Sequence, residues 1–249
     1  MKKFVLLIIG LIFMFGCLNW ENTGKINNTS NLTNNTQTPK PVQNSTISNN
    51  ASVQFSLKRN LIEQAIGSGL KEGNESSKVV LIEFTDYQCP FCRRAHFITL
   101  PQLKEKYVQS GKIEYIKKDL PITAIHSQAE AAAEGVRCAQ EQNKGWQMHD
   151  ELFRIQDEVG GSSTVFFGPT DIKFVANKTG LQMENFNECF DTQKYKQQIK
   201  DDVELAKKLG FSGTPSYLIV KRGTEDAIPV IGAQGAEVFS SIIDEMLKN

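Results

Sequence analysis

Residues 78–92 read KVVLIEFTDYQCPFC, and the two cysteines in this stretch, Cys89 and Cys92, decide how the chain is interpreted. The run at residues 78–85 is short, β-branched and mostly apolar, a pattern typical of a strand that is buried on both faces. The cysteines follow after a short loop, with two residues between them. A pair with this spacing can bind a metal ion, attach a haem, lock a turn or exchange electrons.

Three of these alternatives fit the rest of the chain poorly. A c-type haem requires a histidine directly after the second cysteine, where this chain has Arg93. A structural zinc site requires two further ligands, and Cys138 and Cys189 are isolated from each other in the sequence. A purely structural disulfide across two residues closes a very small loop and therefore constrains the unfolded chain little.

Electron exchange has a positive physical argument. Cys89 is predicted to lie at the start of a helix, where unpaired backbone N–H groups and the helix dipole stabilise a thiolate and lower its pKa. Pro90 suits the first helical position because no N–H is needed there. Cys92 lies one turn further on and can attack a mixed disulfide at Cys89. The spacing is therefore that of a nucleophile and a resolving cysteine.

Composition narrows the class of protein. The 249 residues include 28 basic and 28 acidic side chains, so the formal net charge is zero. This balance gives no reason to expect nucleic acid or an acidic membrane surface as a partner. Five cysteines are too few for a disulfide-stapled miniature fold, and the chain is long enough for an ordinary hydrophobic core.

Strand and helix patterns alternate along the chain. Helical spacing is found at residues 55–66 and 93–109, with Pro101 as a kink; residues 67–77 indicate a turn-rich connection and 112–117 a strand. Five helical segments follow, at residues 127–142, 146–158, 170–179, 184–190 and 194–209. Two short strands, 216–220 and 227–231, and a helix at 237–248 close the chain. The order is β-α-β, an all-helical insertion, then β-β-α, with parallel strands and a right-handed crossover in the first half.

This pattern resembles the DsbA-type branch of the thioredoxin superfamily over about residues 65 to 247. The resemblance rests on EFTDYQCPFC, on Gly-Thr-Pro at 213–215 before a strand, and on the stretches AEAAAEGVRCAQEQNKGWQMHDELF and NECFDTQKYKQQIKDDVELAKKLGFSGTPSYLIV. It implies an α/β thioredoxin fold, with β-α-β and β-β-α halves around a central sheet. The expected domain covers residues 55–249, with the helical insertion at about 126–205.

The resemblance also assigns roles to residues. The family's nucleophilic cysteine falls on Cys89, its resolving cysteine on Cys92 and its cis-proline on Pro215. Glu83, six residues before the first cysteine, falls where the superfamily places a buried acid. Such a carboxyl has a raised pKa and can accept the proton of the resolving thiol. A strand glutamate facing the sheet edge is the alternative.

Client proteins are expected to contact residues around the two catalytic sulfurs. Thr214 and Pro215 would offer backbone to a bound client, and Pro90 and Phe91 lie between the cysteines. Strong oxidases of this family have histidine at the position of Phe91, which cannot form a hydrogen bond. We therefore expect a weaker oxidant.

The remaining cysteines and histidines receive structural interpretations. Cys138 and Cys189 lie on separate predicted helices of the insertion, and in an oxidising compartment they are expected to form a structural disulfide, with two free buried thiols as the alternative. Some relatives have cysteines at similar positions. His96 is interpreted as an exposed helix residue, with tuning of the thiolate as the alternative, and His126 and His149 are interpreted as capping or packing residues.

The N-terminus predicts export. Residues 1–17 begin with Met-Lys-Lys, continue with an apolar run and end in Gly-Cys, which indicates a signal peptide with lipidation at Cys17; an uncleaved anchor is the alternative. Residues 18–54 are rich in Asn, Thr and Ser and indicate a flexible tether. Glycosylation is a further expectation at the Asn-x-Ser/Thr sequons of Asn27, Asn28, Asn31, Asn34, Asn44, Asn50, Asn74 and Asn177.

These expectations combine into one functional hypothesis. The chain is predicted to be a monomeric, extracytoplasmic thiol:disulfide oxidoreductase, tethered to the cell membrane, without cofactor or metal. Its partners would be exported proteins with cysteines and a membrane or extracytoplasmic redox partner, and oxidation is the favoured direction. A reductase or isomerase fed by a membrane electron donor and a non-catalytic chaperone or binding module remain alternatives.

Overall fold

The computed structural model describes residues 55–56, 59–160 and 168–248. The predicted signal peptide, the lipidation site Cys17 and the whole of the predicted tether lie outside the described residues. Among the helices that are described, none combines the length and the apolar character needed to cross a membrane.

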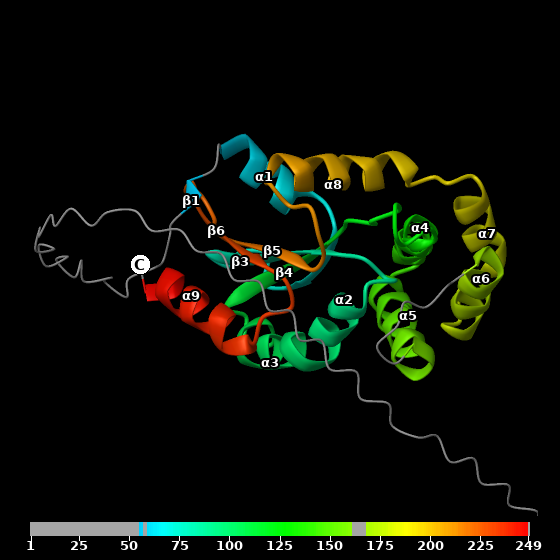
Figure 1. The fold of residues 1–249 in the computed structure, drawn as a ribbon, viewed down its shortest axis with the longest axis horizontal. Helices are drawn as coiled ribbons and strands as arrows, with labels where there is room; N and C mark the ends of the chain where they lie inside the picture. Colours follow the sequence, from blue (N-terminus) through cyan, green and yellow to red (C-terminus); the bar gives the residue numbers. More distant parts are fainter. Residues whose placement is uncertain (1–54, 57–58, 161–167, 249) are drawn as a thin grey trace, which may run out of the picture. The chain divides into compact units, whose positions relative to one another are not determined.

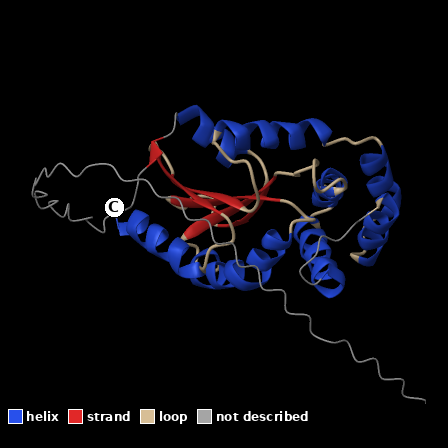
Figure 2. Cartoon of the chain, in the orientation of Figure 1, coloured by secondary structure: helices blue, strands red, loops and turns tan. Residues whose placement is uncertain are grey.

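A mixed sheet of six strands forms the centre of the domain (Figure 2). The strands are β1 (Phe55–Ser56), β2 (Leu70–Gly73), β3 (Val79–Thr85), β4 (Ile113–Asp119), β5 (Ser216–Lys221) and β6 (Asp226–Ile231). Their order is β1-β6-β5-β3-β4-β2. Only β3 and β4 are parallel, as predicted for the β-α-β unit, and the other neighbours are antiparallel.

The predicted turn-rich connection at residues 67–77 is wrong in part, because it contains strand β2. Leu70 pairs with Lys117, and Gly73 with Glu114, at the edge of the sheet. The sequence of this strand, LKEG, has no apolar alternation, so nothing local predicts it. Its backbone pairing with β4 makes it a strand.

Helices cover both faces of the sheet and one of its ends (Figure 1). They are α1 (Arg59–Gly67), α2 (Pro90–Arg94), α3 (Leu100–Leu103), α4 (Ala129–Gln140), α5 (Gly145–Gly160), α6 (Pro169–Lys178), α7 (Met183–Asp191), α8 (Lys196–Lys208) and α9 (Ala236–Lys248). The π-helical segment η1 (Ala95–Thr99) connects α2 to α3, and a second one, η2 (Lys104–Val108), follows α3. Together these four segments form the helical stretch predicted at 93–109. Helices α1 and α8 lie over one face, α3 and α9 over the other, and α4 to α7 gather at one end.

Strand β3 supplies apolar side chains to both faces, as its composition predicted. Val80, Ile82 and Phe84 belong to the core beneath α1 and α8. Val79 and Leu81 belong to the core beneath α3 and α9. Side chains alternate along a strand, so Glu83 lies on the face covered by α3 and α9.

The core of the helical insertion is formed mainly by α4 to α7, extends to the buried side chains of Cys89 and Cys92, and is crossed by a disulfide. Cys138 in α4 is bonded to Cys189 in α7, with an S–S distance of 2.01 Å. The two residues are 51 positions apart in the chain. The bridge thus adds a covalent link between two helices that also pack directly against each other.

Replacing both Cys138 and Cys189 by serine should lower the free energy of unfolding by about 2–4 kcal/mol, because the unfolded chain regains the freedom of a long loop. Disulfide exchange should be retained, since the pair lies outside the Cys89–Cys92 site. Urea unfolding of the variant and the parent protein, each with Cys89 and Cys92 oxidised, measures the difference. Equal midpoints, or a folded variant without exchange activity, would contradict this assignment.

Candidate active site

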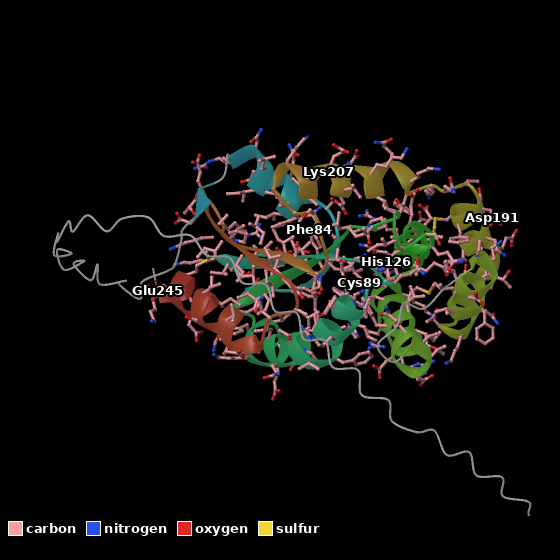
Figure 3. All side chains as sticks on the ribbon, viewed as in Figure 1. Phe84, Cys89, His126, Asp191, Lys207 and Glu245 are labelled. Atoms are coloured by element: carbon pink, nitrogen blue, oxygen red, sulfur yellow. A yellow bond between two sulfur atoms is a disulfide. The ribbon has the colours of Figure 1, made fainter. Side chains whose placement is uncertain are left out.

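Cys89 lies at the point where the chain leaves β3 and enters α2. It occupies the N-cap position with an extended backbone (φ −77°, ψ 120°), and Pro90 follows in the first turn. Its Sγ lies 3.4 Å from the carbonyl oxygen of Thr214, and the Thr214–Pro215 peptide is cis. Figure 3 labels Cys89 near the end of the sheet that faces the insertion. The resemblance-based placement of Thr214 beside the first cysteine thus agrees with the geometry.

The two thiols of the CxxC segment have opposite acidities. The pKa of Cys89 falls to about 6, because the Cys92 thiol, Thr214 and the backbone N–H groups of Phe91 and Cys92 form hydrogen bonds to its sulfur. Burial raises the pKa of Cys92, whose side chain is inaccessible to solvent. At neutral pH the site therefore combines a thiolate at the helix start with a protonated thiol one turn further along.

Glu83 lies beneath this pair in the interior of the domain. It is 1% exposed, and it pairs in register with Lys117 of β4 and Tyr217 of β5. The hydroxyl groups of Tyr115 and Tyr217 donate hydrogen bonds to its two carboxylate oxygens. Burial raises the pKa of Glu83 despite these donors. The alternative of an edge-facing glutamate is wrong, because β3 is an inner strand of the sheet.

A buried Asp–His pair supports the loop that precedes Cys89. Asp86 accepts hydrogen bonds from the backbone N–H of Gln88 at 2.8 Å and of Ile122 at 2.8 Å, and its Oδ2 lies 2.8 Å from His126 Nδ1. The hydrogen bond to Asp86 raises the pKa of His126, and the Cys89 thiolate raises it further. Figure 3 places His126 beside Cys89. In its protonated form His126 would favour the Cys89 thiolate, an interaction that the sequence interpretation as capping or packing did not include.

Replacing His126 by glutamine should raise the pKa of Cys89 by less than about one unit, because the variant keeps a hydrogen-bonding side chain and loses the imidazolium charge. The ultraviolet absorbance of the thiolate, followed against pH, measures this change. His96→Gln is the matched control, since burial lowers the pKa of His96 to about 4 and leaves it neutral at pH 7. An unchanged Cys89 titration in His126→Gln would show that the Asp–His pair only supports the loop.

A buried charged network extends from the site toward the insertion, and the sequence did not indicate it. Lys117 donates to Asp119, and Arg137 of α4 bridges Asp119 and Asp202. Lys118 donates to Asp202 at 2.9 Å. The run KIEYIK at residues 112–117 predicted an alternating strand, and every residue of β4 is buried, its lysines included. This network ties the end of β4 to helices α4 and α8.

The surface around Cys89 carries exposed apolar side chains. Phe91 is 56% exposed between the cysteines, and Ile125 in the loop before α4 is 70% exposed. Phe97 and Ile98, one to two turns beyond Cys92, are 42% and 58% exposed. Apolar surface next to a reactive thiolate is suited to unfolded or extended protein segments.

Comparison with known proteins gives a family match and several relatives. A family model described as Thioredoxin matches residues 67–245. A protein of Bacillus anthracis, named "Probable disulfide bond formation protein D", is 27% identical over 148 residues, which cover 59% of this chain and 67% of that protein. The Na⁺/H⁺ antiporter NhaA 3 of Salinispora tropica is 31% identical over 147 residues, which cover 59% of this chain and 21% of the antiporter. The chain therefore spans about a fifth of the length of such antiporter relatives.

Solved structures share the fold. The α-DsbA1 protein of Wolbachia pipientis superposes with a TM-score of 0.61 at 24% identity, covering 72% of this chain and 90% of that protein. Oxidised BdbD of Bacillus subtilis superposes with a TM-score of 0.64 at 16% identity, covering 79% of this chain and 98% of that protein. The thioredoxin fold with a helical insertion, expected from the sequence, is confirmed.

Proposed function

We propose that this chain, which belongs to the thioredoxin family, is a protein thiol:disulfide oxidoreductase of the DsbA type. One observation carries the proposal most directly: Cys89 has a pKa of about 6 beside the buried Cys92, whose pKa is raised. A stable thiolate next to a protonated resolving thiol is the arrangement that disulfide exchange requires.

In the oxidising direction, a client thiolate attacks Sγ of Cys89 in the Cys89–Cys92 disulfide. A client–Cys89 disulfide forms, and Cys92 leaves as a thiolate that takes a proton from the Glu83 carboxyl. A second client thiolate then attacks the client sulfur and expels Cys89 as a thiolate. The client leaves with a disulfide, and the enzyme is left as a dithiol, reduced by two electrons. In the reverse direction Cys92 attacks the mixed disulfide, and Glu83 accepts its proton.

Thr214, Pro215, Pro90 and Phe91 are proposed to bind the client. The carbonyl of Thr214 lies within hydrogen-bonding distance of the Cys89 sulfur, so an extended client segment can pair with this backbone as it reacts. The exposed ring of Phe91 offers apolar contact to residues that flank the client cysteine.

Oxidation is the proposed direction, with moderate driving force. A pKa of about 6 instead of 9.0 favours the reduced enzyme at pH 7 by about 1.4 kcal/mol, or about 30 mV. The value lies between the roughly 7 of thioredoxin and the roughly 3.5 of DsbA. Phe91 gives the Cys89 thiolate no hydrogen bond from its side chain, in accordance with an oxidant weaker than the strongest members of the family.

We further propose that the domain of residues 55–249 works outside the cytoplasm. Residues 1–17 would direct export, with lipidation at Cys17, and residues 18–54 would tether the domain to the membrane. The disulfide between Cys138 and Cys189 fits an oxidising compartment. Exported proteins with cysteines would be the clients, and a membrane or extracytoplasmic redox partner would restore the Cys89–Cys92 disulfide.

Two measurements test this function. Equilibration of the Cys89–Cys92 pair with glutathione buffers should give a reduction potential between those of thioredoxin and DsbA, about −270 and −120 mV. The oxidised protein should also introduce disulfides into a reduced, unfolded secretory protein. A potential below that of thioredoxin would favour a reductase. Failure to oxidise the client or to reduce insulin in the presence of a dithiol would favour a non-catalytic binding module.

A further inference from the structure

We propose that His96, His149 and Asp150 form a binding site for one divalent transition-metal ion, such as Zn²⁺, between the helix that carries the cysteines and helix α5. Each residue offers one donor atom, and the three atoms lie within 4.8 Å of one another. His96 belongs to η1, which continues from α2, and His149 and Asp150 belong to α5. The disulfide-exchange reaction proposed above uses none of the three side chains.

His149 is the central observation, because it is a buried imidazole with an unused nitrogen. The residue is 1% exposed, and its Nδ1 lies 2.9 Å from the hydroxyl of Tyr87. Within the described residues, its Nε2 is buried and has no hydrogen-bond partner. A buried polar atom without a partner costs about 1–3 kcal/mol, and a bound metal ion would remove that cost.

Tyr87 orients the His149 ring in a way that suits a metal ligand. Lys117 Nζ lies 3.1 Å from the Tyr87 oxygen and donates to it. When the proton of His149 is on Nδ1, that nitrogen also donates to the Tyr87 oxygen, and Nε2 keeps its lone pair. A histidine that ligates a metal usually donates its other ring N–H to a neighbouring oxygen in this manner.

The separation of the donors is close to what coordination requires. His96 Nε2 lies 3.8 Å from Asp150 Oδ1. Ligands about 2.0–2.1 Å from a tetrahedral zinc ion are about 3.3 Å apart, so the donors must approach by up to about 1.5 Å. The Asp150 side chain is 59% exposed and can rotate toward the histidines. Two imidazoles and one carboxylate suit Zn²⁺, Co²⁺ or Ni²⁺ better than Mg²⁺ or Ca²⁺.

The surroundings give a metal ion access and leave few opposing charges. A surface pocket of about 480 Å³ is lined by His96 and Asp150, so an ion and a fourth ligand from water can enter. The cations at this pocket are paired: Arg154 with Glu151 and Glu158, and Lys178 with Glu151. Lys104, behind the histidines, is bonded to Glu72 at 2.8 Å.

Zinc titration of the full chain tests the site. The Cys89–Cys92 disulfide must be formed beforehand, because a free dithiol also binds zinc. Calorimetry should show one Zn²⁺ per chain, and Co²⁺ should give the visible absorption of a tetrahedral site. His96→Gln and Asp150→Asn should each weaken Zn²⁺ binding at least about tenfold. Zn²⁺ should also raise the melting temperature of the parent protein more than that of either variant.

His126→Gln is the matched control, since this histidine is bonded to Asp86 in another part of the domain and its loss should leave zinc affinity unchanged. Asp150 is exposed, so Asp150→Asn should fold and remain informative even if substitutions at His149 do not. Absence of zinc binding by the oxidised parent protein would overturn the proposal. Binding of equal strength in the parent protein, His96→Gln and Asp150→Asn would do the same, because it would place the ion elsewhere.

Discussion

Replacing Cys89 by serine should abolish disulfide exchange, lowering its rate by about 10³-fold or more. Cys89 is the sulfur that receives hydrogen bonds from the start of α2, and its pKa of about 6 makes it the thiolate at neutral pH. A serine hydroxyl at the same position cannot form a disulfide. The rate at which the oxidised protein introduces disulfides into a reduced client measures the effect.

Cys92→Ser is the matched comparison, because it removes the buried thiol and keeps the nucleophile. When its Cys89 thiolate attacks a client disulfide, this variant should form a mixed disulfide that accumulates, because Cys92 is no longer present to attack it. Non-reducing electrophoresis followed by mass spectrometry would identify the trapped bond. If the Cys89→Ser variant trapped clients at Cys92, and the Cys92→Ser variant trapped none at Cys89, the two roles would be reversed.

Alkylation of the reduced protein separates the two thiols by pH. Labelling of Cys89 should rise with a midpoint near pH 6, while Cys92, whose pKa is raised by burial, should stay unlabelled up to alkaline pH.

The oxidising strength of the pair should also depend on pH. A folded-state pKa of Cys89 below the usual 9.0 stabilises the reduced protein fully above pH 9, and this effect is lost as the pH falls through about 6. The low pKa of Cys89 makes the protein a stronger oxidant than a pair with ordinary thiols, and this advantage should disappear as the pH falls below 6.

The parts of the site that the sequence predicted depend on local structure. A buried strand, a short loop and a proline after Cys89 are sufficient to place that sulfur at a helix start, and the structure has this arrangement. The sequence also predicts that Glu83 lies on the opposite face of β3 from Ile82 and Phe84, because side chains alternate along a strand. Its burial then depends on β3 being an inner strand, which the predicted β-α-β and β-β-α order implies.

The parts that sequence analysis missed depend on contacts between distant segments. Strand β2 exists through pairing with β4, and Lys117 is buried because Asp119 and Tyr87 accept its hydrogen bonds. Asp86 stands three residues before Cys89, but its partner His126 is 40 positions away. No periodicity or spacing connects such residues, so only the folded chain shows them together.

Replacing Glu83 by glutamine should slow exchange by about 10²-fold near neutral pH, the lower end of what general acid–base groups contribute. The glutamine occupies the same space beneath the thiols and can accept a hydrogen bond from Tyr115 or Tyr217, but it cannot take up or release the proton of Cys92. The effect should fall on the step in which Cys92 attacks or leaves. Stopped-flow kinetics should therefore show unchanged alkylation of Cys89 and slow resolution of the mixed disulfide.

Glu114→Gln is the matched control for this substitution. Glu114 is also a buried glutamate of the sheet, but it lies on β4, where it forms ion pairs with Arg222 and Lys71. Its replacement removes those ion pairs and should lower stability at pH 7 without slowing the resolution step. Equal slowing of exchange by the two variants would indicate a general loss of packing, and the proton-transfer role of Glu83 would then be wrong.

The pH dependence of stability gives an independent test of the same carboxyl. Burial raises the folded-state pKa of Glu83 above 4.5, so the Glu83 carboxylate binds a proton more tightly in the folded protein than in the unfolded chain. The stabilising contribution of this group is therefore fully present below about pH 4.5 and is lost as the pH rises through the folded-state pKa. Glutamine is neutral at every pH. Relative to the parent protein, Glu83→Gln should gain stability as the pH rises above about 4.5 and show no such gain near pH 4. A pH-independent difference in urea midpoint would mean that Glu83 ionises in the folded protein as readily as in water.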